Sequence, residues 1–275
     1  MPDQTSPKRK TFQPLNQFPA AARRKVSIVF TDIDDTLTND GRLTARAYEA
    51  LERLQQAGIR VVPITGRPAG WCDHIARMWP VDAVVGENGA FYFHYDRQSS
   101  RMLRCFDQAD NIRAENRTRL ASVRDRILAA VPGCAVASDQ AYRETDLAID
   151  FCEDVPALPD NEVVHIVNVF EEAGAVAKIS SIHVNGWFGT FDKLTMARRL
   201  MDEVFGIDID AKNDSIVFTG DAPNDSPMFG FFENSIGVAN VTAFRKHLDA
   251  EPTYVTPSKG GGGFAEVADA LLAVR

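Results

Sequence analysis

Short apolar runs recur through the first third of the chain, and each one ends at polar residues. Residues 26–30 (VSIVF), 59–64 (IRVVPI) and 81–85 (VDAVV) are three such runs of strand length. Continuous apolar runs of this length are typical of strands that are buried on both faces. The pattern therefore predicts three buried strands in the first 90 residues.

The segments between these runs have helical periodicity. Ala47, Ala50 and Leu54 recur at the spacing of one helix face. Thr44 precedes them as an N-cap, and Gly58 follows them at the position that ends many helices. Together with a second helix expected over residues 70–78, this alternation of strands and helices predicts a parallel α/β sheet.

The pattern changes after residue 90 and returns near residue 186. The intervening segment combines alternating strands at 91–95, 147–151 and 178–184 with helices at 114–131 and 162–173. We interpret residues 91–185 as a separate α+β domain inserted into a core. The core is expected to consist of residues 26–90 and 186–275, with a helix at 193–205 and further strands at 215–219 and 235–238.

The two ends of the chain carry fewer signals. Residues 1–25 are polar with basic pairs, and we predict a disordered tail there. No signal-peptide stretch and no membrane-spanning segment is visible, so we expect a cytoplasmic protein. Near the C-terminus, Gly260–Gly263 follow Lys259. A phosphate-binding Walker motif needs Lys-Ser or Lys-Thr after its glycines, so we expect a flexible loop there.

Composition excludes several classes of partner. The 275 residues carry a formal charge of −8, which provides no electrostatic footprint for nucleic acid or for an anionic membrane. The four cysteines form no CxxC pair, which argues against a zinc cluster or a redox motif and for reduced thiols. We expect a monomer or a homodimer that binds a small molecule.

Acidic and hydroxyl side chains follow several of the predicted core strands. Asp32 and Asp34 come after the first strand, Thr65 after the second, and Asp221 and Asp225 after the strand at 215–219. The carboxyl ends of parallel strands meet at one edge of a sheet, where ligands bind. Carboxylates gathered there would repel one another, and a set of oxygen ligands without His or Cys favours Mg²⁺ over zinc.

Four segments resemble, in order, the motifs of the haloacid dehalogenase superfamily. They are FTDIDDTLT at residues 30–38, ITGR at 64–67, Lys193 in FDKLTMA, and GDAPNDSPMF at 220–229. The inserted segment and the ENGA string at 87–90 resemble subclass IIB, which includes sucrose-phosphate phosphatases, mannosyl-3-phosphoglycerate phosphatases and Cof-type sugar phosphatases. The resemblance implies a Rossmann-like parallel-sheet core with an inserted α+β cap that selects the substrate.

The resemblance also implies a mechanism. Asp32 would attack phosphorus and form an aspartyl-phosphate, and Asp34 would protonate the leaving oxygen and then activate water. Thr65 and Asn224 would hydrogen-bond the phosphoryl oxygens, while Lys193 would neutralise charge. The implied Mg²⁺ ligands are the Asp32 carboxylate, the Asp34 carbonyl and Asp221, with Asp225 as a ligand directly or through a water molecule.

The expected reaction is hydrolysis of a small phosphomonoester, a sugar phosphate or a phosphoglycerate-type ester. Candidate substrate-binding residues are Gly66, Arg67, Asn88, Arg143, His183 and Asn185. Two alternatives stay open. A phosphomutase would use the same aspartates and depend on a bisphosphate activator, and a non-catalytic metabolite-binding protein would hydrolyse no phosphoester.

Overall fold

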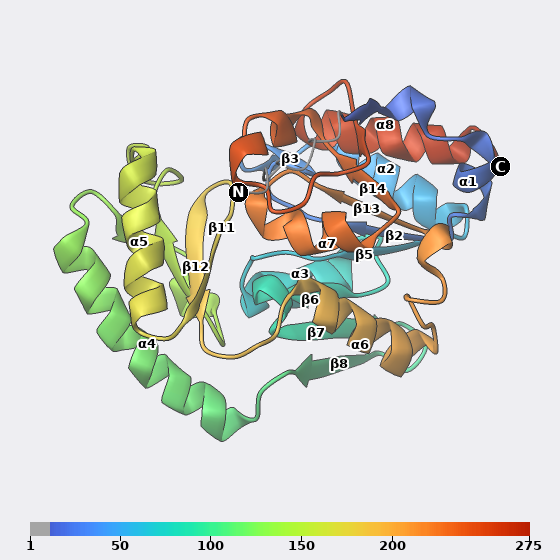
Figure 1. The fold of residues 1–275 in the computed structure, drawn as a ribbon. Helices are drawn as coiled ribbons and strands as arrows, with labels where there is room; N and C mark the ends of the chain where they lie inside the picture. Colours follow the sequence, from blue (N-terminus) through green and yellow to red (C-terminus); the bar gives the residue numbers. More distant parts are fainter. Residues whose placement is uncertain (1–11) are drawn as a thin grey trace, which may run out of the picture.

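The computed structural model describes residues 12–275, and Figure 1 shows two bodies lying side by side. The larger body is built on a parallel sheet with the strand order β1-β15-β14-β13-β2-β5. Its strands are β1 (Gln13–Pro14), β2 (Ile28–Thr31), β5 (Arg60–Pro63), β13 (Ile216–Gly220), β14 (Asn234–Gly237) and β15 (Tyr254–Val255). The predicted α/β fold class is confirmed.

Helices cover both faces of this sheet. They are α1 (Ala20–Lys25), α2 (Ala45–Gln56), α3 (Ala69–Met78), α6 (Lys193–Phe205), α7 (Ser226–Phe231) and α8 (Gly260–Leu272). Alternation along β2 separates two cores, because Val29 packs with α2, α3 and α8 whereas Ile28 and Phe30 pack with α6 and α7. The predicted Thr44 cap is present, since Ala47 N donates to Thr44 Oγ1.

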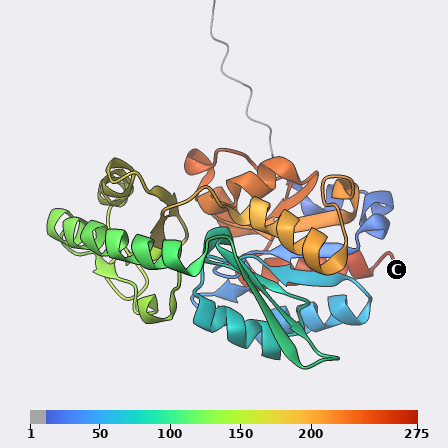
Figure 2. The same ribbon diagram turned by 90° about the horizontal axis from the view of Figure 1, so that it is seen from below.

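A three-stranded antiparallel sheet extends the larger body beyond β5. It comprises β6 (Val84–Gly86), β7 (Phe91–Asp96) and β8 (Arg101–Phe106), in the order β6-β7-β8. A parallel bridge between Ile64 and Val85 connects it to the main sheet. Figure 2 shows this three-stranded sheet beside the main sheet rather than in the smaller body. The strand expected at 91–95 thus pairs with the core segment before it.

The smaller body has its own sheet and core. Its strands, in the order β11-β12-β10-β9, are β9 (Ala135–Val136), β10 (Leu147–Asp150), β11 (Val176–Ile179) and β12 (His183–Trp187). Helices α4 (Asp110–Ala130) and α5 (Asp160–Glu172) pack on one face of this sheet around a separate apolar cluster (Figure 1). We call residues 110–187 the four-stranded unit.

Two local expectations are wrong. Residues 178–184 are not one strand, because β11 and β12 form an antiparallel hairpin whose turn lies at 180–182. Gly260–Gly263 are not a loop but the first turn of α8. Glycine is needed there because Gly260 has φ +50° and a Cβ on it would lie 2.4 Å from the Thr38 carbonyl oxygen.

The predicted tail is also corrected for residues 12–25, while residues 1–11 lie outside the described part of the chain. Gln13 pairs with Tyr254 in the main sheet, and Leu15 and Phe18 are buried. The Phe18 and Tyr254 rings stack with centroids 4.9 Å apart. Two apolar side chains therefore anchor a segment whose overall polarity is typical of a tail.

Replacing Phe18 by alanine is expected to lower the free energy of unfolding by about 3 kcal/mol, because a fully buried ring is lost. Urea unfolding measures this change, with the exposed neighbour Gln17→Ala as the control. Equal stability of the two variants would mean that the N-terminal segment does not pack on the core. Within residues 12–275, no helix combines the length and apolarity needed to cross a membrane.

Candidate active site

Asp32 and Asp221 meet at the carboxyl edge of the main sheet. They directly follow β2 and β13, two strands that pair in parallel register. Asp32 N donates to the Thr219 carbonyl at 2.8 Å, which extends this pairing by one residue. Both side chains are buried, Asp221 completely. The parallel sheet thus places two carboxylates from distant parts of the chain side by side, as the sequence predicts.

A buried lysine links this pair to a third carboxylate. Lys193, the first residue of α6, donates from Nζ to Asp32 Oδ1 at 2.9 Å and to Asp225 Oδ1 at 2.7 Å. Asp32, Asp221 and Asp225 each place a carboxylate oxygen within 4.8 Å of the other two. A lysine is unfavourable at a helix N-terminus, so the two ion pairs explain its burial there.

The charges in this cluster do not balance. Burial raises the pKa of Asp32 to about 8, although Lys193 opposes the shift. Burial also raises the pKa of Asp221, and the neighbouring Asp32 and Asp225 raise it further. Burial lowers the pKa of Lys193, but Asp225 and Asp32 raise it by more, so this lysine stays charged. Three carboxylates face one ammonium group, which leaves an excess of negative charge.

One buried oxygen in the cluster points to a cation. Asp221 Oδ1 accepts from Thr36 Oγ1 at 3.1 Å, but Asp221 Oδ2 is buried with no hydrogen-bond partner among the described residues. An unsatisfied buried carboxylate oxygen is costly, and a bound metal ion would satisfy it. The acidic cluster can therefore hold a divalent metal ion.

Asp225 differs from its two neighbours because its carboxylate is already satisfied. Besides Lys193 Nζ, it accepts hydrogen bonds from the backbone N–H groups of Asp221 at 2.9 Å and Ala222 at 3.2 Å. These bonds fix the loop that carries Asp221. Asp225 is thus suited to orienting Asp221 and Lys193, and its oxygens are less free than those of Asp221 to bind a metal ion directly.

Thr65, Asn88 and Asn224 lie beside this cluster. Thr65 is buried two residues after the end of β5, where its Oγ1 accepts from Arg67 N and its carbonyl accepts from Asn88 N. Asn224 Nδ2 donates to Asn88 Oδ1 at 3.2 Å. Asn88 Nδ2 and Asn224 Oδ1 are buried and have no partner within residues 12–275. One atom of each amide, a donor on Asn88 and an acceptor on Asn224, is therefore available to bind a ligand at this edge.

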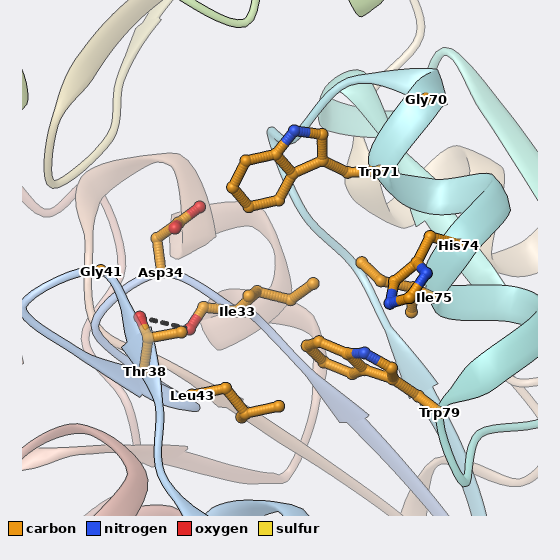
Figure 3. Close-up of a pocket in the computed structure, with 10 residues that line it drawn as sticks. All are labelled: Ile33, Asp34, Thr38, Gly41, Leu43, Gly70, Trp71, His74, Ile75 and Trp79. Atoms are coloured by element: carbon orange, nitrogen blue, oxygen red, sulfur yellow. Dashed lines mark hydrogen bonds between the residues drawn. The ribbon is translucent and has the colours of Figure 1, made fainter.

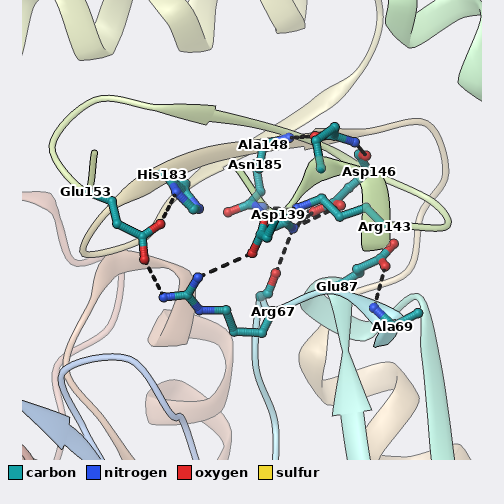
Figure 4. Close-up of polar contacts among 12 residues, drawn as sticks. Arg67, Ala69, Glu87, Asp139, Arg143, Asp146, Ala148, Glu153, His183 and Asn185 are labelled. Carbon is teal, nitrogen blue, oxygen red and sulfur yellow. Dashed lines mark hydrogen bonds and ion pairs between the residues drawn. The ribbon is translucent and has the colours of Figure 1, made fainter. Parts of the chain in front are cut away.

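Arg67 joins the core to the four-stranded unit, as Figure 4 shows in part. Its guanidinium binds the Asp34 carboxylate from Nε and Nη2, with distances of 2.9–3.0 Å. It also donates to Asp139 at 3.3 Å and to Glu153 at 2.7 Å, which belong to the four-stranded unit. One buried cation thus links the candidate acid–base residue Asp34 to two carboxylates of the four-stranded unit.

Arg143 forms a second connection between the bodies. It donates to the Gly66 carbonyl at 2.9 Å, while its remaining donors bind Asp139 and Asp146 at 3.0–3.1 Å. Asn185 Nδ2 donates to Asp146 at 2.8 Å (Figure 4). The structure therefore places Arg143 and Asn185 in one buried polar network.

The remaining candidate, His183, contacts a residue that the sequence analysis missed. His183 Nε2 lies 2.8 Å from Glu153 Oε2. The close approach of the His183 imidazole and the ion pair with Arg67 hold the pKa of Glu153 at about 2, below its ordinary range. Glu153, Asp139 and Asp146 carried no sequence signal, because solvated carboxylates are common in loops and only the fold brings these three to the arginines.

Glu87 is a further residue whose position the sequence did not indicate. Its buried carboxylate accepts from the backbone N–H groups of Ala69 in the core and of Glu144 and Thr145 in the four-stranded unit, at 2.7–3.2 Å. Glu87 and Asn88 both have positive φ, and a Cβ on Gly89 would lie 2.0 Å from the Asp192 carbonyl oxygen. This strained turn therefore anchors the connection between the two bodies.

Replacing Glu87 by glutamine is expected to lower the free energy of unfolding by about 2 kcal/mol. The new amide would place a donor against the backbone N–H groups that the carboxylate now accepts from. Urea unfolding tests this, with exposed Glu52→Gln as the matched control. An unchanged stability for Glu87→Gln would show that these hydrogen bonds contribute little.

Three spaces surround the site. The cleft that contains Asp32, Asp34 and Arg67 is almost closed, at about 10 Å³. A cavity of about 200 Å³ lies beside Lys193 and Asn224. A third, of about 360 Å³, lies against Asp34 and is lined mainly by apolar side chains, with the indoles of Trp71 and Trp79 at its sides (Figure 3).

The fold and the cluster define an α/β protein with an acidic cluster that can hold a divalent cation. Residues 29–110 match the family model described as haloacid dehalogenase-like hydrolase. This match confirms the predicted resemblance to that superfamily over the first part of the core. Comparison with curated protein sequences found no match.

Solved structures share the fold over nearly the whole chain. A Thermoplasma acidophilum protein is 18% identical, with a TM-score of 0.66 and coverage of 91% of this chain and 99% of the other. A putative HAD/COF-like hydrolase from Plasmodium vivax is 18% identical, with a TM-score of 0.65 and coverage of 93% and 99%. The sucrose-phosphatase from Synechocystis is 14% identical, with a TM-score of 0.61 and coverage of 90% and 98%.

Proposed function

We propose that this protein is a Mg²⁺-dependent phosphatase that removes the phosphoryl group from a small phosphomonoester. The observation that carries the proposal is the buried cluster in which Lys193 bridges Asp32 and Asp225 beside the unpartnered oxygen of Asp221. Such a site offers a nucleophile, a fixed cation and a place for a metal ion. The family match supports a hydrolase, and the phosphatases among the structures of the same fold support this reaction class.

Asp32 is the proposed nucleophile. Its carboxylate attacks phosphorus and forms an aspartyl-phosphate, while Lys193 neutralises the charge on Asp32 and on the arriving phosphate. Thr65 and Asn224 would bind the phosphoryl oxygens. When bound by Asp32, the Asp34 carbonyl and Asp221, Mg²⁺ supplies electrostatic shielding between the anionic carboxylate and the anionic phosphate. Asp225 would contribute by orienting the Asp221 loop.

Asp34 is the proposed acid–base group. It would give a proton to the leaving oxygen and later take one from the attacking water. Arg67 fixes the Asp34 carboxylate through two nitrogens, so we propose that Arg67 orients it. The same arginine binds Asp139 and Glu153, which couples the position of Asp34 to that of the four-stranded unit.

We propose that the four-stranded unit acts as a cap over the site, with β7 and β8 belonging to the core. Because Arg67 and Arg143 close the cleft, substrate entry would require these contacts to open. A cap of this size disfavours macromolecular substrates and favours a small one. The sucrose-phosphatase of the same fold was solved with sucrose and phosphate, which supports a phosphorylated metabolite here. Cytoplasmic location and a monomeric or dimeric state stay predictions.

A phosphate-release screen tests the proposal. The purified protein is assayed with an aryl phosphate, sugar phosphates and phosphoglycerates, with Mg²⁺ and after chelation with EDTA. We expect release that requires Mg²⁺. Absence of release from every ester in the presence of Mg²⁺ would contradict the proposal and favour the non-catalytic alternative, whereas release that needs a bisphosphate activator would favour a phosphomutase.

A further inference from the structure

One face of the β11–β12 hairpin lies toward the acidic cluster, since His183 and Asn185 line the cleft that contains Asp32. Side chains alternate along a strand, so His183, Asn185 and Trp187 share one face of β12. Val184 lies on the opposite face, in the apolar cluster of α4 and α5. Lys178 pairs directly with Asn185 across the hairpin, and directly paired residues share a face. Lys178 therefore lies on the side of the candidate site.

A cavity of about 200 Å³ separates this face from the core. Its lining includes Asn88, Lys178, Trp187, Asp192, Lys193 and Asn224. Lys193 contacts Asp32, and Asn224 also lines the cleft that contains Asp32 and Asp34. The cavity is thus directly adjacent to the proposed nucleophile.

Three residues that line this cavity carry buried polar atoms without a partner in the described part of the chain. They are Asn88 Nδ2, Asn224 Oδ1 and Trp187 Nε1, on side chains that are at least 93% buried. Each unsatisfied buried group costs free energy, so such groups commonly mark a place where a ligand or an ion binds. Two of the three atoms are donors, and the site is therefore suited to a ligand with acceptor oxygens.

The charged groups around the cavity favour an anion. Lys178 makes no ion pair within residues 12–275, whereas Lys193 is committed to Asp32 and Asp225. The acidic residue in the lining, Asp192, caps α6 by accepting from Thr195 N. On the other side of the site, the donors of Arg67 and Arg143 already bind carboxylates and one carbonyl. The cleft that contains Arg67 has almost no free volume, so the cavity beside Lys178 is the better place for a ligand.

We propose that this cavity receives the leaving group of the substrate and that Lys178 binds a carboxylate on it. Among small phosphomonoesters, the chain would then prefer those whose leaving group is a hydroxy acid. Trp187 Nε1–H and Asn88 Nδ2 would donate to the same ligand. This inference rests on the proposed phosphatase function and selects the phosphoglycerate type over neutral sugar phosphates.

Matched pairs of substrates test the proposal. 3-Phosphoglycerate and glycerol 3-phosphate differ by a carboxylate in place of a hydroxymethyl group at one end, as do the open-chain esters 6-phosphogluconate and sorbitol 6-phosphate. We expect a higher kcat/KM for the acidic member of each pair. Lys178→Met should lower kcat/KM for the acidic members by roughly 10- to 100-fold, the usual effect of losing a charged hydrogen bond, and leave the neutral members nearly unchanged.

Lys212→Met is the matched control, since Lys212 is exposed and lies outside the lining of the cavity. Equal loss for both members of a pair, no preference for the acid in the wild type, or hydrolysis of neither pair would overturn the inference. An aryl phosphate assayed in parallel distinguishes failure of the Lys178 inference from failure of the proposed phosphatase function. If its Mg²⁺-dependent hydrolysis persists, only the Lys178 inference has failed. If it is absent, the phosphatase function itself has failed.

Discussion

Replacing Asp32 by asparagine should abolish phosphate release, with a fall in kcat on the order of 10⁴-fold, as is usual when a nucleophile is removed. The amide has nearly the shape of the carboxylate but cannot attack phosphorus. The protein should stay folded, because the change removes one of three crowded carboxylates and Lys193 keeps its ion pair with Asp225.

Asp40→Asn is the control for this variant. Asp40 is exposed and has φ +49°, a conformation that asparagine tolerates well, so both activity and folding should match the wild type. Activity of Asp32→Asn within a few-fold of the wild type would rule out Asp32 as the nucleophile. Circular dichroism and thermal unfolding of both variants distinguish lost chemistry from lost structure.

Replacing Lys193 by methionine should lower the free energy of unfolding by about 3–5 kcal/mol and also remove activity. The methionine fills a similar volume, but Asp32 and Asp225 lose the one cation that both contact. Uncompensated buried carboxylates are costly, whereas a lysine on the surface contributes little. Lys25→Met removes an exposed ion pair with Asp214 and should leave the urea midpoint unchanged.

A double variant separates charge from packing. Lys193→Met combined with Asp225→Asn removes one of the two stranded carboxylates, and the new amide oxygen can still accept from the backbone of the Asp221 loop. Part of the lost stability should therefore return. A double variant less stable than Lys193→Met would show that Lys193 acts mainly through packing.

The core and its acidic cluster could be predicted because each depends on local sequence. Buried parallel strands appear as continuous apolar runs, and the residue after each run lies at the carboxyl edge of the sheet. Asp32 and Asp221 are therefore expected at the same edge of the sheet, and they lie side by side because β2 and β13 are neighbours in the strand order. The first residue of α6 was also found at Lys193, because apolar periodicity begins immediately after it.

The parts that could not be predicted depend on contacts between distant segments. The N-terminal segment is polar on average, and the burial of Leu15 and Phe18 follows from a surface that the sequence does not display. The turn at 180–182 is only three residues long and contains neither glycine nor proline, so its two serines gave a weak turn signal. The hairpin was therefore interpreted as one strand, and the register of Lys178 with Asn185 was hidden. Glu87 is recognisable only by the backbone groups that surround it.

Detection of an aspartyl-phosphate on Asp32 is the decisive test of the proposed mechanism. Wild-type protein with Mg²⁺ is mixed with its best ester substrate, quenched in acid within the first turnover, digested and examined by mass spectrometry. We expect a phosphoryl group on the peptide that contains Asp32, and none in Asp32→Asn. A phosphoryl group on any other residue, or rapid turnover by a wild-type protein that never carries one, would contradict the mechanism.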